Sequence, residues 1–326
     1  MDERAQDRTR GRLAVPGDAM NPGTLQPDAP VFDRAPVPRH RLLLVRGDLD
    51  GLVAAALLRA SGAVQEVTFV RARDARAGRV AVGSGTIAVG LPALAASVSL
   101  AFVADAHGSA ARAVHDRLGG AAAFPALQPE LLAAADACAQ GAWTPEEILA
   151  PTGWTLLDRI LDPRTRLGSW RAFRLCDGAF RLRMIDLVRL QDPEAILCDR
   201  HVSERVRLLV EHEGAWHALL RRRSVRRGAV QLLDLRGEPR VVAGDPLAMD
   251  ALAPDARFLV GVRSVAPGVA ELRIRRGAWT GGPLPDLAAV LGAAAEEGDA
   301  TEVVLRVPAA DADLRLDAVL RTLDAL

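Results

Sequence analysis

The chain has 326 residues, half of them hydrophobic, which is enough for two domains with conventional cores. Lysine and arginine together number 41, as do aspartate and glutamate, so no overall charge favours binding to nucleic acid or an anionic membrane. The three cysteines are isolated, which excludes a paired-cysteine zinc site and a disulfide framework and favours a reducing cytoplasm. Nucleic acid and membranes are therefore not expected as partners.

The first 38 residues are rich in proline, aspartate, arginine and glycine and have no sustained apolar period, which predicts a disordered tail. They lack the apolar core of a signal peptide. The most apolar window, residues 89–104, contains Pro92 and is too short to span a bilayer. These features predict a cytoplasmic protein.

Strand and helix patterns alternate from residue 41 onward. We predict helices at 51–61 and 109–118, and strands at 41–46, 66–71, 86–90 and 98–104. Alternation of this kind is typical of an α/β fold in which helices flank a parallel sheet. The segment 128–190 has mostly helical periodicity, with a strong helix start at Thr144.

The pattern changes to strands after Gly228. We expect one long helix at 201–223, then strands at 229–235, 239–243, 257–263, 268–276 and 301–307, with helices at 246–252, 285–294 and 312–325. The predicted organisation is a parallel-sheet domain at 39–200, a linker helix within 201–226 and a smaller mixed α/β domain at 227–326.

Two carboxylates, Asp48 and Asp50, follow the short apolar run 42–45 and precede a helical pattern. The carboxyl ends of strands in open α/β sheets are where ligands and metals collect, and carboxylate oxygens suit Mg²⁺ or Mn²⁺. This arrangement predicts phosphate chemistry assisted by a metal. The structural alternative is that one of the two aspartates caps the helix.

A haloacid dehalogenase type of phosphatase also begins with a strand that ends in Asp-x-Asp. That family needs a downstream lysine, a later acidic pair, and threonine or valine after the motif glycine. This chain has no lysine and no adjacent aspartates, and Leu52 follows Gly51. The sequence therefore argues against this family.

Five motifs occur in the order found in the exopolyphosphatase-like branch of the DHH phosphoesterases. They are VRGDLDGLVAA at 45–55, SAARAVHDRLGG at 109–120, EEILAPTGW at 146–154, DPRTRLGSWRAFR at 162–174 and LLDLRGE at 232–238. From residue 40 to the end the chain resembles this branch, whose members pair a parallel-sheet domain with a smaller substrate-binding domain. The resemblance implies a two-metal centre, usually of manganese, in which Asp48 and Asp50 are metal ligands.

The resemblance is incomplete at the other ligand positions. Asp105 and His107 stand where an Asp-His-His motif is expected, either as a decayed motif or as the turn left by a deletion. The later metal aspartate would fall at Ala139, with Asp136 one turn earlier. The C-terminal Gly-Gly-His loop is missing from residues 292–298, where two glutamates stand instead.

Two functions fit these departures. The first is a catalytically degenerate protein that binds a phosphorylated ligand or a protein partner and holds at most one Mn²⁺ or Mg²⁺. The second is an active phosphoesterase for polyphosphate, short oligonucleotides or a phosphorylated small molecule, with a reduced site built from Asp48, Asp50, Asp105, His107 and Asp136. In either case Arg46, Arg164 and Arg171 are candidate ligand-binding residues, the last two also being candidates for ion pairs between helices.

Other side chains favour structural roles. His212 and His217 are five residues apart, which predicts positions on a helix surface. The arginine run at 221–227 predicts a solvated hinge, with nucleic-acid binding as a third hypothesis. Trp143, Trp154, Trp170 and Phe173 are spaced irregularly, which favours core packing over a platform for stacking bases.

Overall fold

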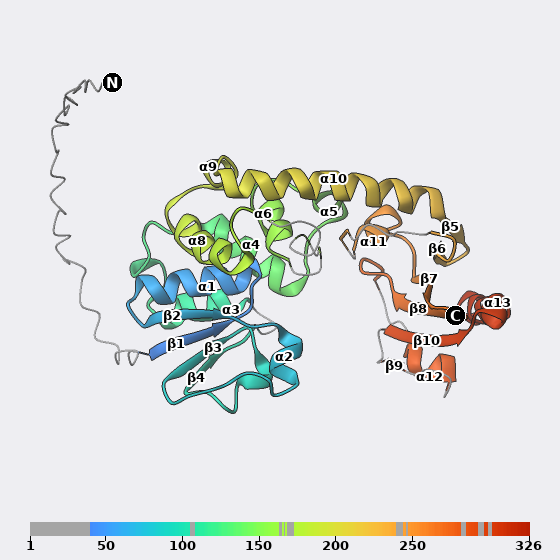
Figure 1. Cartoon of the computed structure of the whole chain (residues 1–326), viewed down its shortest axis with the longest axis horizontal. Coiled ribbons are helices and arrows are strands. Elements are labelled where there is room, and N and C mark those ends of the chain that lie inside the picture. Colours follow the sequence, from blue (N-terminus) through green and yellow to red (C-terminus); the bar gives the residue numbers. More distant parts are fainter. Residues whose placement is uncertain are drawn as a thin grey trace, which may run out of the picture. The chain divides into compact units, whose positions relative to one another are not determined.

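The computed structural model describes residues 40–104, 108–162, 165, 167, 173–238, 244–245, 247–281, 285–292, 297–298 and 302–326 (Figure 1). Predictions for the tail, for Asp105 and His107, for Arg164 and Arg171, and for the strand at 239–243 lie outside these residues.

The first sheet contains four parallel strands in the order β2-β1-β3-β4. The strands are β1 (His40–Val45), β2 (Val64–Phe69), β3 (Thr86–Val89) and β4 (Leu100–Phe102). The predicted parallel sheet is therefore confirmed. Because β1 is an inner strand, the residues that follow it leave the sheet from its interior.

Apolar residues cover both faces of this sheet. Leu43 and Val45 of β1 pack into the main core, whereas Leu44 packs with Leu91 and Leu94 on the opposite face. Coverage of both faces explains why the strand reads as a continuous apolar run rather than an alternating one. The second face is covered by α2 (Ala72–Arg76) and by a 3₁₀ turn (Pro92–Leu94).

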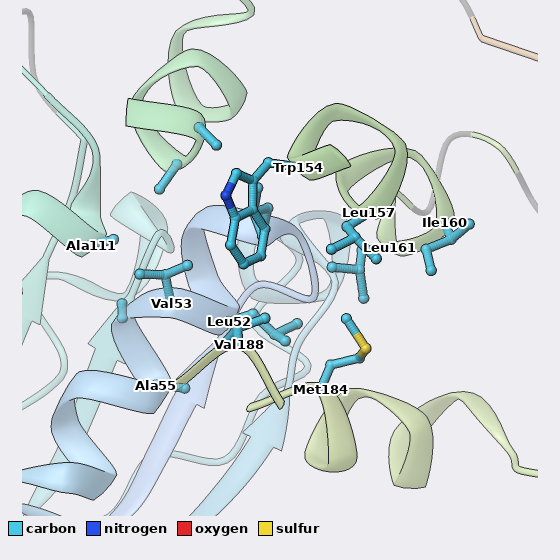
Figure 2. Packing of buried hydrophobic residues seen from close by; sticks show 14 of the residues in the cluster. Leu52, Val53, Ala55, Ala111, Trp154, Leu157, Ile160, Leu161, Met184 and Val188 are labelled. Atoms are coloured by element: carbon cyan, nitrogen blue, oxygen red, sulfur yellow. The ribbon is translucent and has the colours of Figure 1, made fainter. Parts of the chain in front are cut away.

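Helix α1 (Leu49–Ala60) is the centre of the main core. Its residues are buried from Leu49 to Leu58, because it contacts α3 (Ala110–Arg117), α4 (Pro129–Gln140) and α8 (Asp177–Leu190). Figure 2 shows Leu52 and Val53 of α1 among Trp154, Met184 and Val188. Alanine and leucine let neighbouring helices approach closely around α1.

Four further helices complete this part of the chain: α5 (Pro145–Leu149), α6 (Gly153–Leu161), α9 (Pro193–Leu197) and α10 (Arg200–Arg223). Thr144 forms a capping box with Glu147 at the start of α5, as the sequence predicted. The long helix is present, but the prediction that His217 lies on its surface is wrong. His217 is only 8% exposed, and Glu213, one turn earlier, is only 6% exposed.

The second sheet is mixed and has the strand order β5-β6-β7-β8-β10-β9. Its strands are β5 (Ser224–Arg227), β6 (Val230–Asp234), β7 (Phe258–Ala266), β8 (Val269–Arg276), β9 (Glu297–Gly298) and β10 (Glu302–Pro308). Only β6 and β7 are parallel among these pairs. One core of the sheet packs against α12 (Leu287–Leu291) and α13 (Ala312–Asp324), and α11 (Ala248–Leu252) precedes β7.

The arginine run at 221–227 does not form a free hinge. Arg222 and Arg223 end α10 and both contact Glu238, whereas Arg226 lies in β5 and pairs with Asp255. Strand β5 was missed because its charged sequence carries no alternating apolar signal; Gly228, with φ of 52°, turns the chain into β6.

No helix among the described residues is long and apolar enough to cross a membrane. The domain boundaries stay predictions.

Candidate functional site

The turn between β1 and α1 is built around Asp48. Its Oδ1 accepts a hydrogen bond of 3.1 Å from the amide of Gly51, so Asp48 is the N-cap of α1, as the structural alternative predicted. A Cβ atom at Gly51 would lie 2.2 Å from the Arg46 carbonyl oxygen. The turn therefore requires glycine at this position and holds the Asp48 side chain against the end of the sheet.

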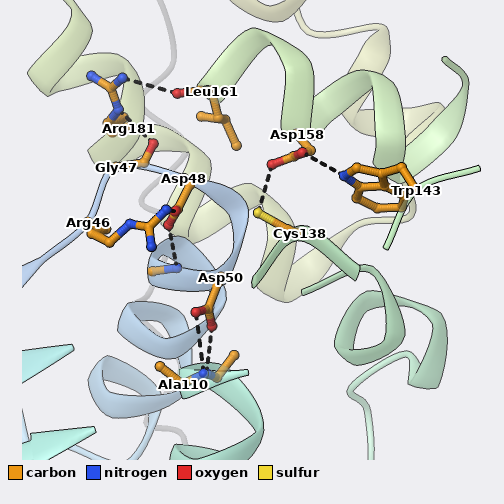
Figure 3. Close-up of polar contacts among 12 residues, drawn as sticks. Arg46, Gly47, Asp48, Asp50, Ala110, Cys138, Trp143, Asp158, Leu161 and Arg181 are labelled. Carbon is orange, nitrogen blue, oxygen red and sulfur yellow. Dashed lines mark hydrogen bonds and ion pairs between the residues drawn. The ribbon is translucent and has the colours of Figure 1, made fainter. Parts of the chain in front are cut away.

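The second oxygen of Asp48 is buried and makes no hydrogen bond within the described residues. It forms an ion pair with the guanidinium of Arg46, whose side chain is 45% exposed (Figure 3). Arg46 thus partly neutralises a carboxylate that is only 5% exposed.

Asp50 connects α1 to the start of α3. Its Oδ1 accepts from the amide of Ala111 at 2.7 Å and its Oδ2 from the amide of Ala110 at 3.3 Å (Figure 3). Burial, followed by the charge of Asp48, raises the pKa of Asp50 to about 7. Each oxygen accepts one hydrogen bond from an amide and keeps further acceptor capacity.

Asp136 holds the residues just before α3. Its Oδ1 accepts from the amide of Ser109 at 2.9 Å, and its Oδ2 accepts from Arg112 Nε at 2.7 Å. Burial opposes ionisation of Asp136, but the hydrogen bonds from Arg112 and Ser109 outweigh it and lower the pKa. Asp50 of α1 and Asp136 of α4 therefore both bind backbone amides at the start of α3, between Ser109 and Ala111.

A further buried carboxylate, Asp158 of α6, lies near this turn. Its Oδ1 accepts from the Cys138 thiol at 3.0 Å and its Oδ2 from Trp143 Nε1 at 3.2 Å (Figure 3). Burial is the main cause that raises the pKa of Asp158 to about 6, and the charge of Asp48 contributes. The sequence does not indicate this role of Asp158, because no local signal reveals contacts with residues 15 and 20 positions away.

Arg181 of α8 binds the backbone of the turn. Its Nε donates to the Gly47 carbonyl at 3.0 Å, and its NH2 group donates to the Leu161 carbonyl at 3.2 Å. A Cβ atom at Gly47 would lie 2.5 Å from Arg181 Nε, so the small residue permits this contact. Burial lowers the pKa of Arg181.

The described part of the chain contains no group of three histidine, cysteine, aspartate or glutamate side chains placed to hold one metal ion. It brings Asp48 and Asp50 together and gives Asp136 separate partners in Arg112 and Ser109. Asp105, His107, Arg164 and Arg171 lie outside the described residues, so their roles stay predictions.

No protein-family profile and no curated protein matches this sequence. A solved structure of PggH, described as a pGpG-specific phosphodiesterase from Vibrio cholerae, matches the chain with a TM-score of 0.80. The sequences are 26% identical, and the match covers 88% of this chain and 99% of PggH. PggH is a DHH-family phosphodiesterase, and this match confirms the resemblance to the DHH family, whereas the exopolyphosphatase-like branch stays a prediction.

The chain therefore has the DHH phosphoesterase fold, with a second, mixed α/β domain. Two RecJ structures are also similar at a lower level, both with a TM-score of 0.43. An exonuclease RecJ bound to manganese is 16% identical, with 86% of this chain and 90% of RecJ covered. RecJ from Thermus thermophilus in complex with Mn²⁺ is 15% identical, with 86% of this chain and 52% of RecJ covered.

Proposed function

We propose that the chain is a metal-dependent phosphodiesterase that cleaves short linear nucleotides, the substrate class for which PggH is named. The observation that carries this proposal is the match over nearly the whole length of PggH. The two buried aspartates after β1, at the sheet edge where α/β enzymes bind their ligands, support it.

The residues present at this turn fit one divalent ion. Asp48 offers a buried oxygen whose partner within the described residues is the guanidinium of Arg46, which a bound ion would replace, and both oxygens of Asp50 keep acceptor capacity beside their amides. Mn²⁺ or Mg²⁺ prefers such hard oxygen ligands. When bound, the ion supplies Lewis acidity and a water of lowered pKa. Asp105 and His107 remain candidates for completing the ligand set.

The chain's own residues would position the substrate and the ligands. Arg46, half exposed beside Asp48, would bind a phosphate oxygen, as would Arg164 and Arg171. Asp136 has its oxygens engaged by Ser109 and Arg112, so its role in this proposal is to hold the start of α3. Burial of the carboxylates excludes water and strengthens their interaction with a cation.

A second candidate is a protein that binds a phosphorylated ligand or a protein partner without cleaving it. The Arg46–Asp48 ion pair favours this candidate, because a guanidinium then occupies the side of Asp48 that a metal would use. The two candidates differ in metal uptake and in turnover, so one series of variants separates them.

The test is hydrolysis of pGpG in Mn²⁺ by the wild type, by Asp48→Asn and by Asp186→Asn. Asparagine caps a helix as well as aspartate does, so Asp48→Asn removes a charge while keeping the cap of α1. Asp186 is exposed on α8 and serves as the matched control. We expect turnover by the wild type and control and a loss of at least about 100-fold in Asp48→Asn. Absence of turnover in the wild type would favour the binding protein.

A further inference from the structure

A hollow of about 650 Å³ lies where the N-terminal ends of α4, α5, α6 and α9 meet. Its volume is in the range of pockets that bind small molecules. The hollow is lined by neither Asp48 nor Asp50, and no arginine or histidine of the described chain lines it. Its walls combine three kinds of chemistry, each of which restricts the ligand.

The first kind is aromatic. Trp143 and Trp154 line the hollow together with small residues of α4. The indole of Trp143 is fixed by its hydrogen bond to Asp158, and that of Trp154 packs over Leu52 and Val53 of α1 (Figure 2). Rigid indoles of this kind favour a planar, aromatic ligand.

The second kind is a set of free hydrogen-bond donors at the start of α6. Thr152 is the N-cap residue, but its side chain caps no amide. The first intrahelical bond joins the Leu156 amide to the Thr152 carbonyl, which leaves the amides of Gly153, Trp154 and Thr155 without acceptors among the described residues. These three residues line the hollow.

The side chain of Thr155 is an independent indication that the hollow is a ligand site. This residue is only 6% exposed and lines the hollow, and its hydroxyl is not one of the fully buried atoms that lack a partner in the described chain, so it keeps access to the space of the hollow. A buried hydroxyl without a partner is unfavourable unless a ligand or water satisfies it. Because Thr155 lines the hollow, its hydroxyl and the free amides of α6 can bind the same ligand there.

The third kind is a set of acceptors at the rim. Glu147 and Asp192 line the hollow but are engaged in capping α5 and α9. Glu130 and Glu194 are exposed lining residues that make no ion pair or hydrogen bond within the described residues. Their carboxylates are free to accept hydrogen bonds from a ligand, and together the four acids repel phosphate from the hollow.

We propose that this hollow binds a guanine base, and that it holds a base of the short nucleotide substrate named in the proposed function, on which this inference rests. Guanine carries a carbonyl oxygen beside two neighbouring N–H donors on one edge. The oxygen matches the free donors of α6, one carboxylate of Glu130 or Glu194 accepts from both N–H groups, and the ring lies against the indoles. Adenine has an amino group in place of that oxygen and would leave the donors unpaired.

Asp158 lies between the hollow and the turn of the candidate site, since it bonds to Trp143 in the wall and feels the charge of Asp48. Trp143 in that wall and Cys138 of α4 donate to the two oxygens of the same carboxylate, that of Asp158. A base in the hollow would leave its sugar and phosphates outside, because of the acids at the rim.

The experiment is isothermal titration of the full chain with guanosine, adenosine and cytidine, in EDTA so that no metal contributes. Nucleosides carry no phosphate, so they report on the base alone. We expect guanosine to bind with one site per chain and adenosine and cytidine to bind at least about 10-fold more weakly. The variants are Thr155→Val, which keeps the shape and removes the hydroxyl, and the double variant Glu130→Gln/Glu194→Gln. Each should weaken guanosine binding about 10-fold.

Two controls keep the result interpretable. Thr155→Ser keeps the hydroxyl and should bind guanosine as the wild type does. Glu146→Gln changes an exposed acid in the first turn of α5 that does not line the hollow, and it should have no effect. Equal binding of guanosine and adenosine, no binding of guanosine, or unchanged binding by the Thr155→Val and double variants would overturn the proposal. Guanosine binding without pGpG hydrolysis would refute the proposed catalysis and leave the base pocket standing.

Discussion

The carboxylate of Asp50, at the start of α1, accepts a hydrogen bond of 2.7 Å from the amide of Ala111, 61 residues later in the first turn of α3. The same carboxylate accepts from Ala110, so one side chain serves two of the amides that a helix start leaves without partners. The turn that follows β1 is thereby tied to the residues that follow β4.

Replacement of Asp50 by alanine should loosen the start of α3. We expect the amides of Ala110 and Ala111 to exchange with solvent at least about 10-fold faster, because each loses its acceptor in a buried site. Hydrogen exchange of the peptide 108–117 measures this effect. Asp186→Ala should leave the same peptide unchanged. Unaltered exchange in Asp50→Ala would show that α3 does not depend on this contact.

Alanine at Gly51 and alanine at Gly214 should have opposite effects on stability. At Gly51 the new Cβ would meet a backbone oxygen at 2.2 Å, so we expect a loss of more than about 2 kcal/mol in the free energy of unfolding. Gly214 is exposed in the middle of α10 with no heavy atom within 4 Å of a new Cβ, so alanine should add about 0.5–1 kcal/mol. Urea denaturation measures both, and equal effects would contradict the turn geometry.

Glu213 should make stability depend on pH. It is 6% exposed, its Oε1 has no hydrogen-bond partner within the described residues, and burial raises its pKa to about 7 against the partial opposition of Arg159. The folded chain then holds this proton more tightly than the unfolded chain, whose glutamate has a pKa of 4.5. Stability from this group is therefore present below pH 4.5 and is lost as the pH rises to about 7.

Glu213→Gln should flatten that dependence. Urea unfolding at pH 8 should show the variant more stable than the wild type by about 1–3 kcal/mol, with little difference near pH 4.5. Glu211→Gln changes an exposed acid of the same helix and should follow the wild type at both values. A Glu213→Gln variant that loses stability at pH 8 would contradict the unpaired, buried state of Glu213.

The three cysteines should differ in reactivity. Cys176 and Cys198 are exposed, whereas burial and the neighbouring Asp158 carboxylate raise the pKa of Cys138 well above its usual value. The thiolate is the reactive form, so a disulfide reagent should label two thiols rapidly in the folded chain and a third only after denaturation in guanidinium. Cys138→Ser should leave the two rapid reactions unchanged. Three rapid reactions in the folded wild type would contradict the described position of Cys138.

Local sequence signals predicted the parts of the site that local structure makes. The apolar run 42–45, the capping aspartate and Gly51 are adjacent in the chain, so strand, turn and helix could be recognised together. The parallel sheet followed from the alternation of strands and helices, and the family followed from motifs spread along the chain. Each of these signals depends on residue type and spacing.

The remaining contacts join residues that no spacing rule relates. Arg181 donates a hydrogen bond to Gly47, which lies 134 residues earlier in the chain. Asp158 accepts hydrogen bonds from Cys138 in α4 and from Trp143 in the segment before α5. The burial of His217 depends on the helices that pack against α10, which its own sequence does not indicate. The irregular spacing of Trp143 and Trp154 favoured core packing. Both indoles are largely buried, but they also line the hollow beside α6.

In the function that we propose, Asp48 and Asp50 hold a divalent ion that serves phosphodiester cleavage. The most direct measurement is isothermal titration of Mn²⁺ into the wild type and Asp48→Asn, followed by pGpG hydrolysis in the same buffer. We expect stoichiometric Mn²⁺ binding and turnover by the wild type, with both lost in Asp48→Asn although the cap of α1 is kept. Equal Mn²⁺ binding by the two proteins, or turnover that survives the substitution, would contradict it.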